Sequence, residues 1–324
     1  MAIRSYESYE YLPESKQLRN TKYFDEEVRI AKKIVRTIPL RDDNPRTCIG
    51  CGRNEIELFF TKWDVEYFRC QKCGTVFANT DEDTVRKFSR DTELKELRTC
   101  EDYQNSIAEK RSVSWSELID WISYRSFRYL GKNKNLKITD VGNRYTKLAD
   151  MIKTSGLCSE YELTDSIWSD KKLDETDDGH ADVILCFDRI QNSTDPLSDI
   201  KKLNTKLKEG GLLYLGLKIG SGFEMLVLKE HADVFPYEHI FLPSVGSLEQ
   251  IMEKAKFEIL DESTPGKMDV ASVLEKKDHI DQSELFIRKF IETADPRLLN
   301  EFQHFLQKSG MSSYARIVAR KASR

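Results

Sequence analysis

Short apolar runs alternate with amphipathic segments between residues 136 and 217. Four of these runs have the length and composition of buried strands, at residues 136–141, 161–163, 181–187 and 212–217. After the first run, Leu148, Met151 and Ile152 follow the i, i+3, i+4 spacing of one helix face. Strands that alternate with helices in this way predict a parallel α/β sheet with right-handed crossovers.

The helix before the last of these strands carries its own start and stop signals. Asp195 can cap the first turn, and Pro196 occupies the first helical position, where proline is best tolerated. Apolar residues line one face of this segment, and Gly210–Gly211 can end it with a left-handed turn. The pattern therefore predicts one helix that ends at the paired glycines.

The flanking segments read mostly as helices. An N-terminal region, residues 1–45, comprises a polar arm and one amphipathic helix. A helical connector at residues 81–131 leads to the α/β unit, residues 132–324. Within that unit, a helical insertion at about 270–308 precedes a last strand at 314–319. Such an insertion commonly forms a lid or a subunit interface, so a homo-oligomer through these C-terminal helices is one expectation.

Two cysteine pairs give the most specific local signal. Cys48 and Cys51 form one C-x-x-C-G knuckle, and Cys70 and Cys73 form the other. This spacing lets both thiolates of a pair reach one tetrahedral ion, and the glycine after each pair tolerates the angles of a tight knuckle. The pattern predicts a zinc ribbon at residues 46–80 whose zinc is structural, because four thiolates leave no open coordination position. Disulfide pairing of the same cysteines is the alternative.

Composition narrows the class of protein. The 324 residues are 39% hydrophobic and 33% charged, with a net charge of −4, as in a soluble globular protein. That charge is too small and of the wrong sign to imply nucleic acid as the main partner. A ribbon protein that binds nucleic acid remains a third alternative, and it would need a basic face. No apolar run approaches the roughly 20 residues that span a bilayer, and the N-terminus lacks a signal peptide's apolar centre. Paired cysteine spacing without a disulfide framework is typical of a reducing compartment, so a cytoplasmic location is expected.

The order of elements resembles the class I S-adenosylmethionine-dependent methyltransferases. The resemblance spans residues 115–257 and includes the Lys208-Glu209-Gly210-Gly211 junction before a strand. The ribbon motif Tyr67-x-x-Cys70-x-x-Cys73-Gly74 is similar to the amino-terminal zinc module of methyltransferases that act on sugars and surface polysaccharides. The resemblance implies a Rossmann-like sheet, mostly parallel with an antiparallel last strand. It also implies S-adenosylmethionine as cofactor.

Individual residues match the cofactor side of that family's site. Asp140 and Gly142 match the loop that approaches the cofactor's amino-acid portion. Asp165 matches the acidic residue that binds the ribose hydroxyls, and Phe187, at the end of the third strand, completes the cofactor-binding set.

Another segment, Pro236-x-x-His239, resembles the acceptor side of the site. On this pattern His239 is the general base or a hydrogen-bond donor to the substrate, with help from Tyr237. A purely structural histidine at a loop-to-helix junction is the alternative. The acceptor would be a small-molecule sugar or nucleotide sugar, and the zinc ribbon would form one wall of its cleft.

Several residues depart from the family's pattern. Arg144 and Thr146 stand where the second and third loop glycines are expected, and Gln191 and Asn192 replace an ionisable pair after the third strand. Neither amide side chain can act as a general base. A second hypothesis therefore stays open, in which the chain is a catalytically silent binding or assembly subunit.

Arg144 separates these two hypotheses. Its side chain can fold across the site, held by Asp165 or Asp140, and plug the cofactor's space. Alternatively it can swing outward, with its charge in solvent or against a cofactor carboxylate. The second arrangement is favoured, because Gly142 still provides the tight turn.

Overall fold

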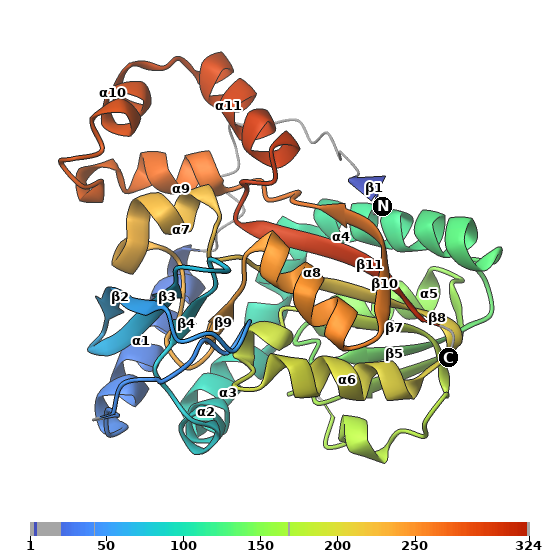
Figure 1. Cartoon of the computed structure of the whole chain (residues 1–324). Coiled ribbons are helices and arrows are strands. Elements are labelled where there is room, and N and C mark those ends of the chain that lie inside the picture. The colour runs from blue at the N-terminus through green and yellow to red at the C-terminus, as the bar shows by residue number, and fades with distance from the viewer. Residues whose placement is uncertain (1–2, 5–20, 42, 168, 323–324) are drawn as a thin grey trace.

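A seven-stranded sheet forms the centre of the protein, in the order β1-β10-β11-β8-β7-β5-β6 (Figure 1). The computed structural model describes residues 3–4, 21–41, 43–167 and 169–322, so most of the predicted N-terminal arm lies outside the described residues. The strands are β1 (Ile3–Arg4), β5 (Leu136–Val141), β6 (Cys158–Thr164), β7 (Ala181–Phe187), β8 (Leu207–Lys218), β10 (Phe257–Ser263) and β11 (Tyr314–Lys321). Strands β6, β5, β7 and β8 are parallel, and β11 is antiparallel to both of its neighbours. The predicted fold class is confirmed.

Helices cover both faces of this sheet because its central strands are apolar on both sides. Along β7, Ile184 packs toward α6 (Pro196–Lys206) and α8 (Val245–Lys254), whereas Val183 and Leu185 pack toward α4 (Glu101–Leu130) and α5 (Thr146–Thr154). All three side chains are fully buried. Alternate side chains of a strand point to opposite faces, so a continuous apolar run is what a two-sided core requires.

The expected end of helix α6 is wrong. Asp195 does cap the helix by accepting from the Ser198 backbone N–H at 3.1 Å, but the helix ends at Lys206 and β8 begins at the next residue. A shift of register between β7 and β8 leaves residues 208–211 outside the regular ladder. Gly210 has a φ of +73° there. The glycines thus serve a bulge in the strand rather than a helix cap.

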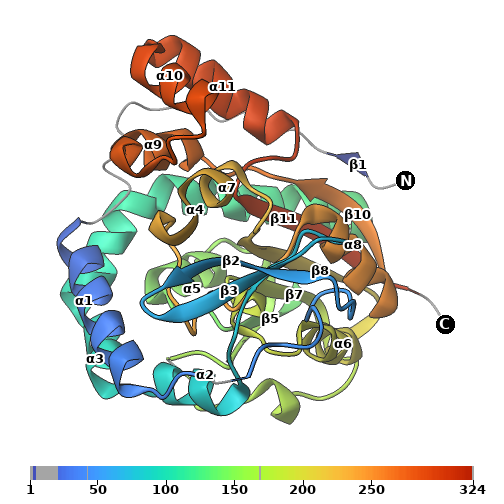
Figure 2. The same ribbon diagram turned by 60° about the vertical axis from the view of Figure 1, so that its left-hand side comes forward.

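A second, four-stranded sheet joins the cysteine-rich module to the α/β unit. It has the order β2-β3-β4-β9, with β2 (Ile56–Lys62), β3 (Val65–Cys70) and β4 (Val76–Ala78) from the module. The fourth strand, β9 (Phe241–Leu242), belongs to the α/β unit and pairs antiparallel with β4. Figure 2 looks onto the hairpin β2–β3 where it lies in front of the central strands.

The remaining helices flank these two sheets. On the N-terminal side they are α1 (Thr21–Thr37), α2 (Glu82–Ser89) and α3 (Thr92–Thr99), and beyond β8 they are α7 (Phe223–Leu228), α9 (Asp269–Glu275), α10 (Leu285–Thr293) and α11 (Pro296–Lys308). Helices α9 to α11 occupy the predicted insertion and project from one end of the molecule (Figure 1). Asp269 anchors them beside β11 by accepting at 2.7 Å from the backbone N–H of Ser313, the residue before that strand. None of the helices in the described ranges combines the length and hydropathy of a membrane span.

Candidate functional site

The four paired cysteines converge on one point of the ribbon. Their sulfur atoms all lie within 4.8 Å of one another. The Sγ atoms of Cys48 and Cys73 are 3.7 Å apart, and those of Cys51 and Cys70 are 3.6 Å apart. A tetrahedral zinc ion with bonds of about 2.3 Å places its sulfur ligands roughly 3.8 Å apart, whereas a disulfide bond is about 2.05 Å long. The geometry therefore fits a structural zinc and not disulfides.

The ribbon contacts the segment that carries His239. The Tyr67 hydroxyl donates to the His239 backbone carbonyl at 3.1 Å, and the Ala78 N–H donates to the carbonyl of Ile240 at 2.9 Å. Two residues after Cys73, the hydroxyl of Thr75 donates to that of Ser247 at 2.9 Å. Folding of the ribbon thus fixes the backbone of residues 239–242.

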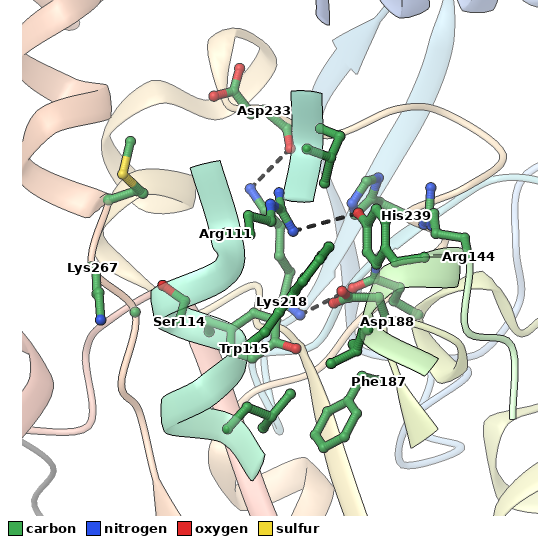
Figure 3. A pocket seen from close by; sticks show the side chains of 18 of the residues that line it. Arg111, Ser114, Trp115, Arg144, Phe187, Asp188, Lys218, Asp233, His239 and Lys267 are labelled. Carbon is green, nitrogen blue, oxygen red and sulfur yellow. Dashed lines mark hydrogen bonds between the residues drawn. The ribbon is translucent and has the colours of Figure 1, made fainter. Parts of the chain in front are cut away.

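A cavity of about 450 Å³ lies beside this segment, at the carboxyl ends of the parallel strands. Its walls come from α1, α4, the loop after β5, the end of β7 and the segment that contains His239. Figure 3 shows the labelled side chains of Arg111, Arg144, Asp188, Lys218 and His239 around this space. The carboxyl edge of an open parallel sheet is where α/β proteins bind ligands, and the volume suits a small molecule.

The loop after β5 is held by side chains rather than by a series of glycines. Gly142 has a φ of +79° and starts the turn. Asn143 then donates to the Asp140 carboxylate at 2.8 Å and accepts from the Tyr145 backbone N–H at 2.8 Å. From α4, Gln104 accepts from the Thr146 N–H at 3.1 Å. Thr146 also donates its hydroxyl to Gln104, so its side chain is engaged by α4.

Asp140 presents a buried carboxylate to the cavity. Its side chain is only 2% exposed and accepts hydrogen bonds from Tyr161 and Asn143. Burial raises the pKa of Asp140 to about 6, although the two donors act in the opposite direction. No cation lies within ion-pair distance of this carboxylate among the residues that the structure describes.

Arg144 adopts neither of the arrangements predicted for it. Its Nη1 atom lies 2.7 Å from the Glu238 carboxylate, which also accepts from Arg98 at 2.9 Å. Arg98 in turn pairs with Glu27 of α1 at 2.8 Å. Burial disfavours the ionised form of Glu238, but the two guanidinium groups outweigh it and hold its pKa far below the usual range. The arginine is neutralised within a buried network, so its charge is not available to a ligand.

His239 is at the cavity in a fixed tautomer. Its Nδ1 atom accepts from the Phe235 backbone N–H at 3.0 Å, so the neutral ring carries its hydrogen on Nε2. Burial lowers the pKa of His239 to about 3. This arrangement favours the predicted role of hydrogen-bond donor over that of general base; the role itself stays a prediction.

Asp188 is a second carboxylate at the cavity and directly follows β7. Its φ of +59° is unusual for a residue other than glycine. Burial raises the pKa of Asp188, while the charges of Arg144 and Arg111 and a hydrogen bond from Tyr314 lower it. Strained backbone at a ligand cavity is common where a side chain must be aimed at a bound molecule.

The central stretch of the chain matches a known family. Residues 107–262 match the model of a methyltransferase domain. The match indicates an S-adenosylmethionine-dependent methyltransferase and includes most of the cavity-lining residues. No curated protein sequence matches the chain.

Solved structures of methyltransferases share similarity with the chain. One is a putative sarcosine dimethylglycine methyltransferase from Galdieria sulphuraria, at 13% identity over 64% of this chain and 85% of that chain, with a TM-score of 0.40. Another is phosphoethanolamine N-methyltransferase 2 from Haemonchus contortus in complex with phosphomonomethylethanolamine and S-adenosylhomocysteine. Its identity is 16% over 64% of this chain and 53% of that chain, about half its length, with a TM-score of 0.42.

Two residues assigned from the resemblance lie away from the cavity of the methyltransferase domain. Tyr237 is 3% exposed, its ring packs edge-on against Phe88 with centroids 6.2 Å apart, and it does not line the cavity. Its catalytic role stays a prediction that this position does not favour. Asp165 directly follows β6, as expected, but does not line the cavity. Beside Gly142, the stem of Arg189 fills the space that a Cβ would need, at 2.8 Å. Gly142 therefore serves this close packing as well as the turn.

The other assigned residues of the domain do line the cavity. They are Asp140, Gly142, Phe187 and His239. Gln191 lines it too, but both of its polar ends have structural partners. Its side-chain oxygen accepts from the Lys218 N–H at 3.1 Å, and its backbone carbonyl accepts from the Ile240 N–H at 2.7 Å. Gln191, which stands where the related methyltransferases have an ionisable residue, thus links its own segment to those of Lys218 and Ile240.

Sequence reasoning missed Asp188 and Arg111 in the domain. Asp188 had a usable signal, because an acidic residue directly after a buried parallel strand lies at the ligand-binding edge. Arg111 had no such signal, because an arginine on a helix rich in charged residues is usually exposed to solvent. Only the approach of α4 to the loop after β5 brings its guanidinium to the cavity.

Proposed function

We propose that this protein transfers the methyl group of S-adenosylmethionine to a hydroxyl group of a small sugar or nucleotide sugar. One observation carries the proposal: one cavity in the methyltransferase domain holds the carboxyl groups of Asp140 and Asp188 together with His239. A site that transfers a methyl group to a hydroxyl needs a cofactor pocket, a proton acceptor and a group that orients the acceptor oxygen.

The chemistry of the lining fits the cofactor. S-adenosylmethionine supplies an electrophilic methyl group on a positively charged sulfur. Asp140 provides negative charge for the cofactor's cationic groups, and Phe187 provides an aromatic ring at the end of β7. Gly142 turns the chain at the edge of this pocket. The proposal includes no contact from Asp165, because that side chain does not line the cavity.

Asp188 is the proposed proton acceptor. Its carboxylate accepts the proton of the acceptor hydroxyl as that oxygen bonds to the methyl carbon and the carbon–sulfur bond breaks. Desolvation makes Asp188 a stronger base than an exposed carboxylate, which is the direction that proton abstraction near neutral pH requires. Tyr314 orients the carboxylate through its hydrogen bond, and the Nε2–H of His239 is available to orient the acceptor oxygen.

The lining also supports a polar acceptor. Lys218 and Glu224 form an ion pair of 3.3 Å at one part of the wall, and the Lys218 ammonium donates to the Asp233 carbonyl at 2.9 Å. Trp115 and Tyr145 present aromatic surface at another part, with ring centroids 5.5 Å apart. Polar groups that converge beside aromatic faces suit a hydroxylated ring. Zinc, held by the four cysteines, would be structural and would stabilise the wall that carries His239.

A direct test uses S-adenosylmethionine labelled in the methyl group. The protein is incubated with separate panels of nucleotide sugars and of small amines, and label in each acceptor is counted against a reaction without acceptor. We expect acceptor-dependent label in at least one sugar. Transfer to amines alone would contradict the hydroxyl acceptor, and absence of transfer to either panel with intact cofactor binding would favour the silent subunit.

A further inference from the structure

Most cations around the cavity are already neutralised by carboxylates. Arg98 and Arg144 pair with Glu238 at 2.9 and 2.7 Å. Lys218 pairs with Glu224 at 3.3 Å. At the rim, the Lys267 ammonium lies 2.8 Å from the carboxylate of Glu117. These ion pairs hold the walls together and leave little net positive charge for a ligand.

Arg111 is different. Its guanidinium has no carboxylate oxygen within 4.0 Å among the residues of the described ranges. Its contacts are with Tyr145: the guanidinium carbon lies 5.4 Å from the ring centroid, and Nη1 donates to the hydroxyl at 3.5 Å. That hydrogen bond is at the long limit of such contacts. Arg111 thus brings a positive charge to the cavity, and none of its donors is bonded to a carboxylate of the described residues.

The position of Arg111 is next to the proposed cofactor pocket. Tyr145, against which it packs, lies three residues after Gly142 in the loop that starts α5. Asp188 is near enough to influence the pKa of Arg111 electrostatically. Asp140, which forms no ion pair with another described residue, lines the same cavity. A cation and a carboxylate that are not paired with protein charges are together complementary to an α-amino acid, which carries both an ammonium and a carboxylate group.

We infer that Arg111 binds the carboxylate of the cofactor's methionine portion through a charge-assisted hydrogen bond. This inference rests on the proposed use of S-adenosylmethionine. The sequence allowed Arg144 to contact the cofactor's carboxylate. Because Arg144 is paired with Glu238 in the structure, we assign that contact to Arg111 instead. The guanidinium fork matches carboxylate geometry, and its packing on Tyr145 pre-orients it.

Two ligands that differ in the amino-acid portion test this inference. S-adenosylhomocysteine carries the carboxylate, whereas 5′-methylthioadenosine keeps the adenosine and the sulfur but lacks it. For Arg111→Gln, calorimetry should show S-adenosylhomocysteine binding weakened about 10- to 100-fold, the range for a charged hydrogen bond. Binding of 5′-methylthioadenosine should change less than about 3-fold. Arg111→Lys should keep part of the discrimination, because the charge remains without the fork.

Arg144→Gln is the matched control. It removes another cavity-lining guanidinium, but one that is already paired, so it should leave the ratio of the two affinities unchanged. A ratio that changes in Arg144→Gln and not in Arg111→Gln overturns the inference. Equal weakening of both ligands by Arg111→Gln also overturns it, because that result indicates a structural role on Tyr145. If the unmodified protein binds neither ligand, the proposed function fails and the inference fails with it.

Discussion

Replacement of Cys73 by serine is expected to release the metal and to unfold the ribbon. Among the described residues, the apolar cluster around the four sulfurs has two buried members besides cysteines, Phe68 and Phe77, and two partly buried ones, Ile49 and Ile56. It is too small to replace a structural ion. Binding of a structural zinc contributes roughly 10–16 kcal/mol of apparent free energy at pH 7, and that free energy is coupled to local folding. The purified protein should contain one zinc per chain, and Cys73→Ser should contain little.

Loss of the metal is also expected to loosen the segment beside the cavity that carries His239. When the ribbon unfolds, β9 loses its pairing with β4, and the His239 carbonyl loses the Tyr67 hydroxyl. Limited proteolysis should therefore cut within residues 46–80 and also near His239. Cys100→Ser is the matched control, because Cys100 is exposed and stands outside the cluster. Full metal content with an unchanged proteolysis pattern in Cys73→Ser would rule out a structural metal.

Asp188→Asn is expected to abolish most of the methyl transfer. Loss of a general base typically lowers the rate 10²- to 10⁴-fold. The amide has nearly the shape of the carboxylate and can still accept from Tyr314, so the affinity for S-adenosylhomocysteine should change far less than kcat. A fall in kcat of less than about 3-fold would exclude Asp188 as the base.

The pH profile gives an independent readout of the same residue. A protonated carboxyl group cannot accept a proton, so kcat should fall as the pH falls through the pKa of Asp188. Burial raises that pKa above the ordinary value of 3.8, so the acidic limb should lie at a higher pH than that of an exposed carboxylate. Asp188→Asn should lack this limb. Glu117→Gln should retain it, because Glu117 lies at the rim in an ion pair with Lys267.

The succession of strands and helices along the chain could be predicted from the sequence, because each of these elements is indicated by residues close to one another. The apolar run 181–187 is buried on both faces as predicted, and Asp195 caps the expected helix. The error at Gly210–Gly211 arose because a left-handed glycine serves a strand bulge as well as a helix end. Local sequence does not distinguish those two uses.

The ion-pair partners of the charged residues could not be predicted from the sequence. Arg144 and Glu238 are 94 residues apart in sequence and meet at 2.7 Å. The pairing depends on the three-dimensional fold, which places the carboxylate of Glu238 beside Arg144 instead of that of Asp140 or Asp165. The same holds for the pairing of β4 with β9, which joins the ribbon to the segment that carries His239. The expected role of the ribbon as a wall of the cleft is wrong, because no residue of 46–80 lines the cavity. The cysteine spacing was sufficient to predict the cluster but not its connection to His239.

Calorimetry with S-adenosylhomocysteine on the full chain tests the central claim most directly. The cavity that holds Asp140, Asp188, Arg111 and His239 is proposed to be a working cofactor pocket. We expect a clear binding heat with one site per chain. No heat at high protein concentration, from protein that retains its zinc, would contradict the account and leave a methyltransferase fold without its cofactor.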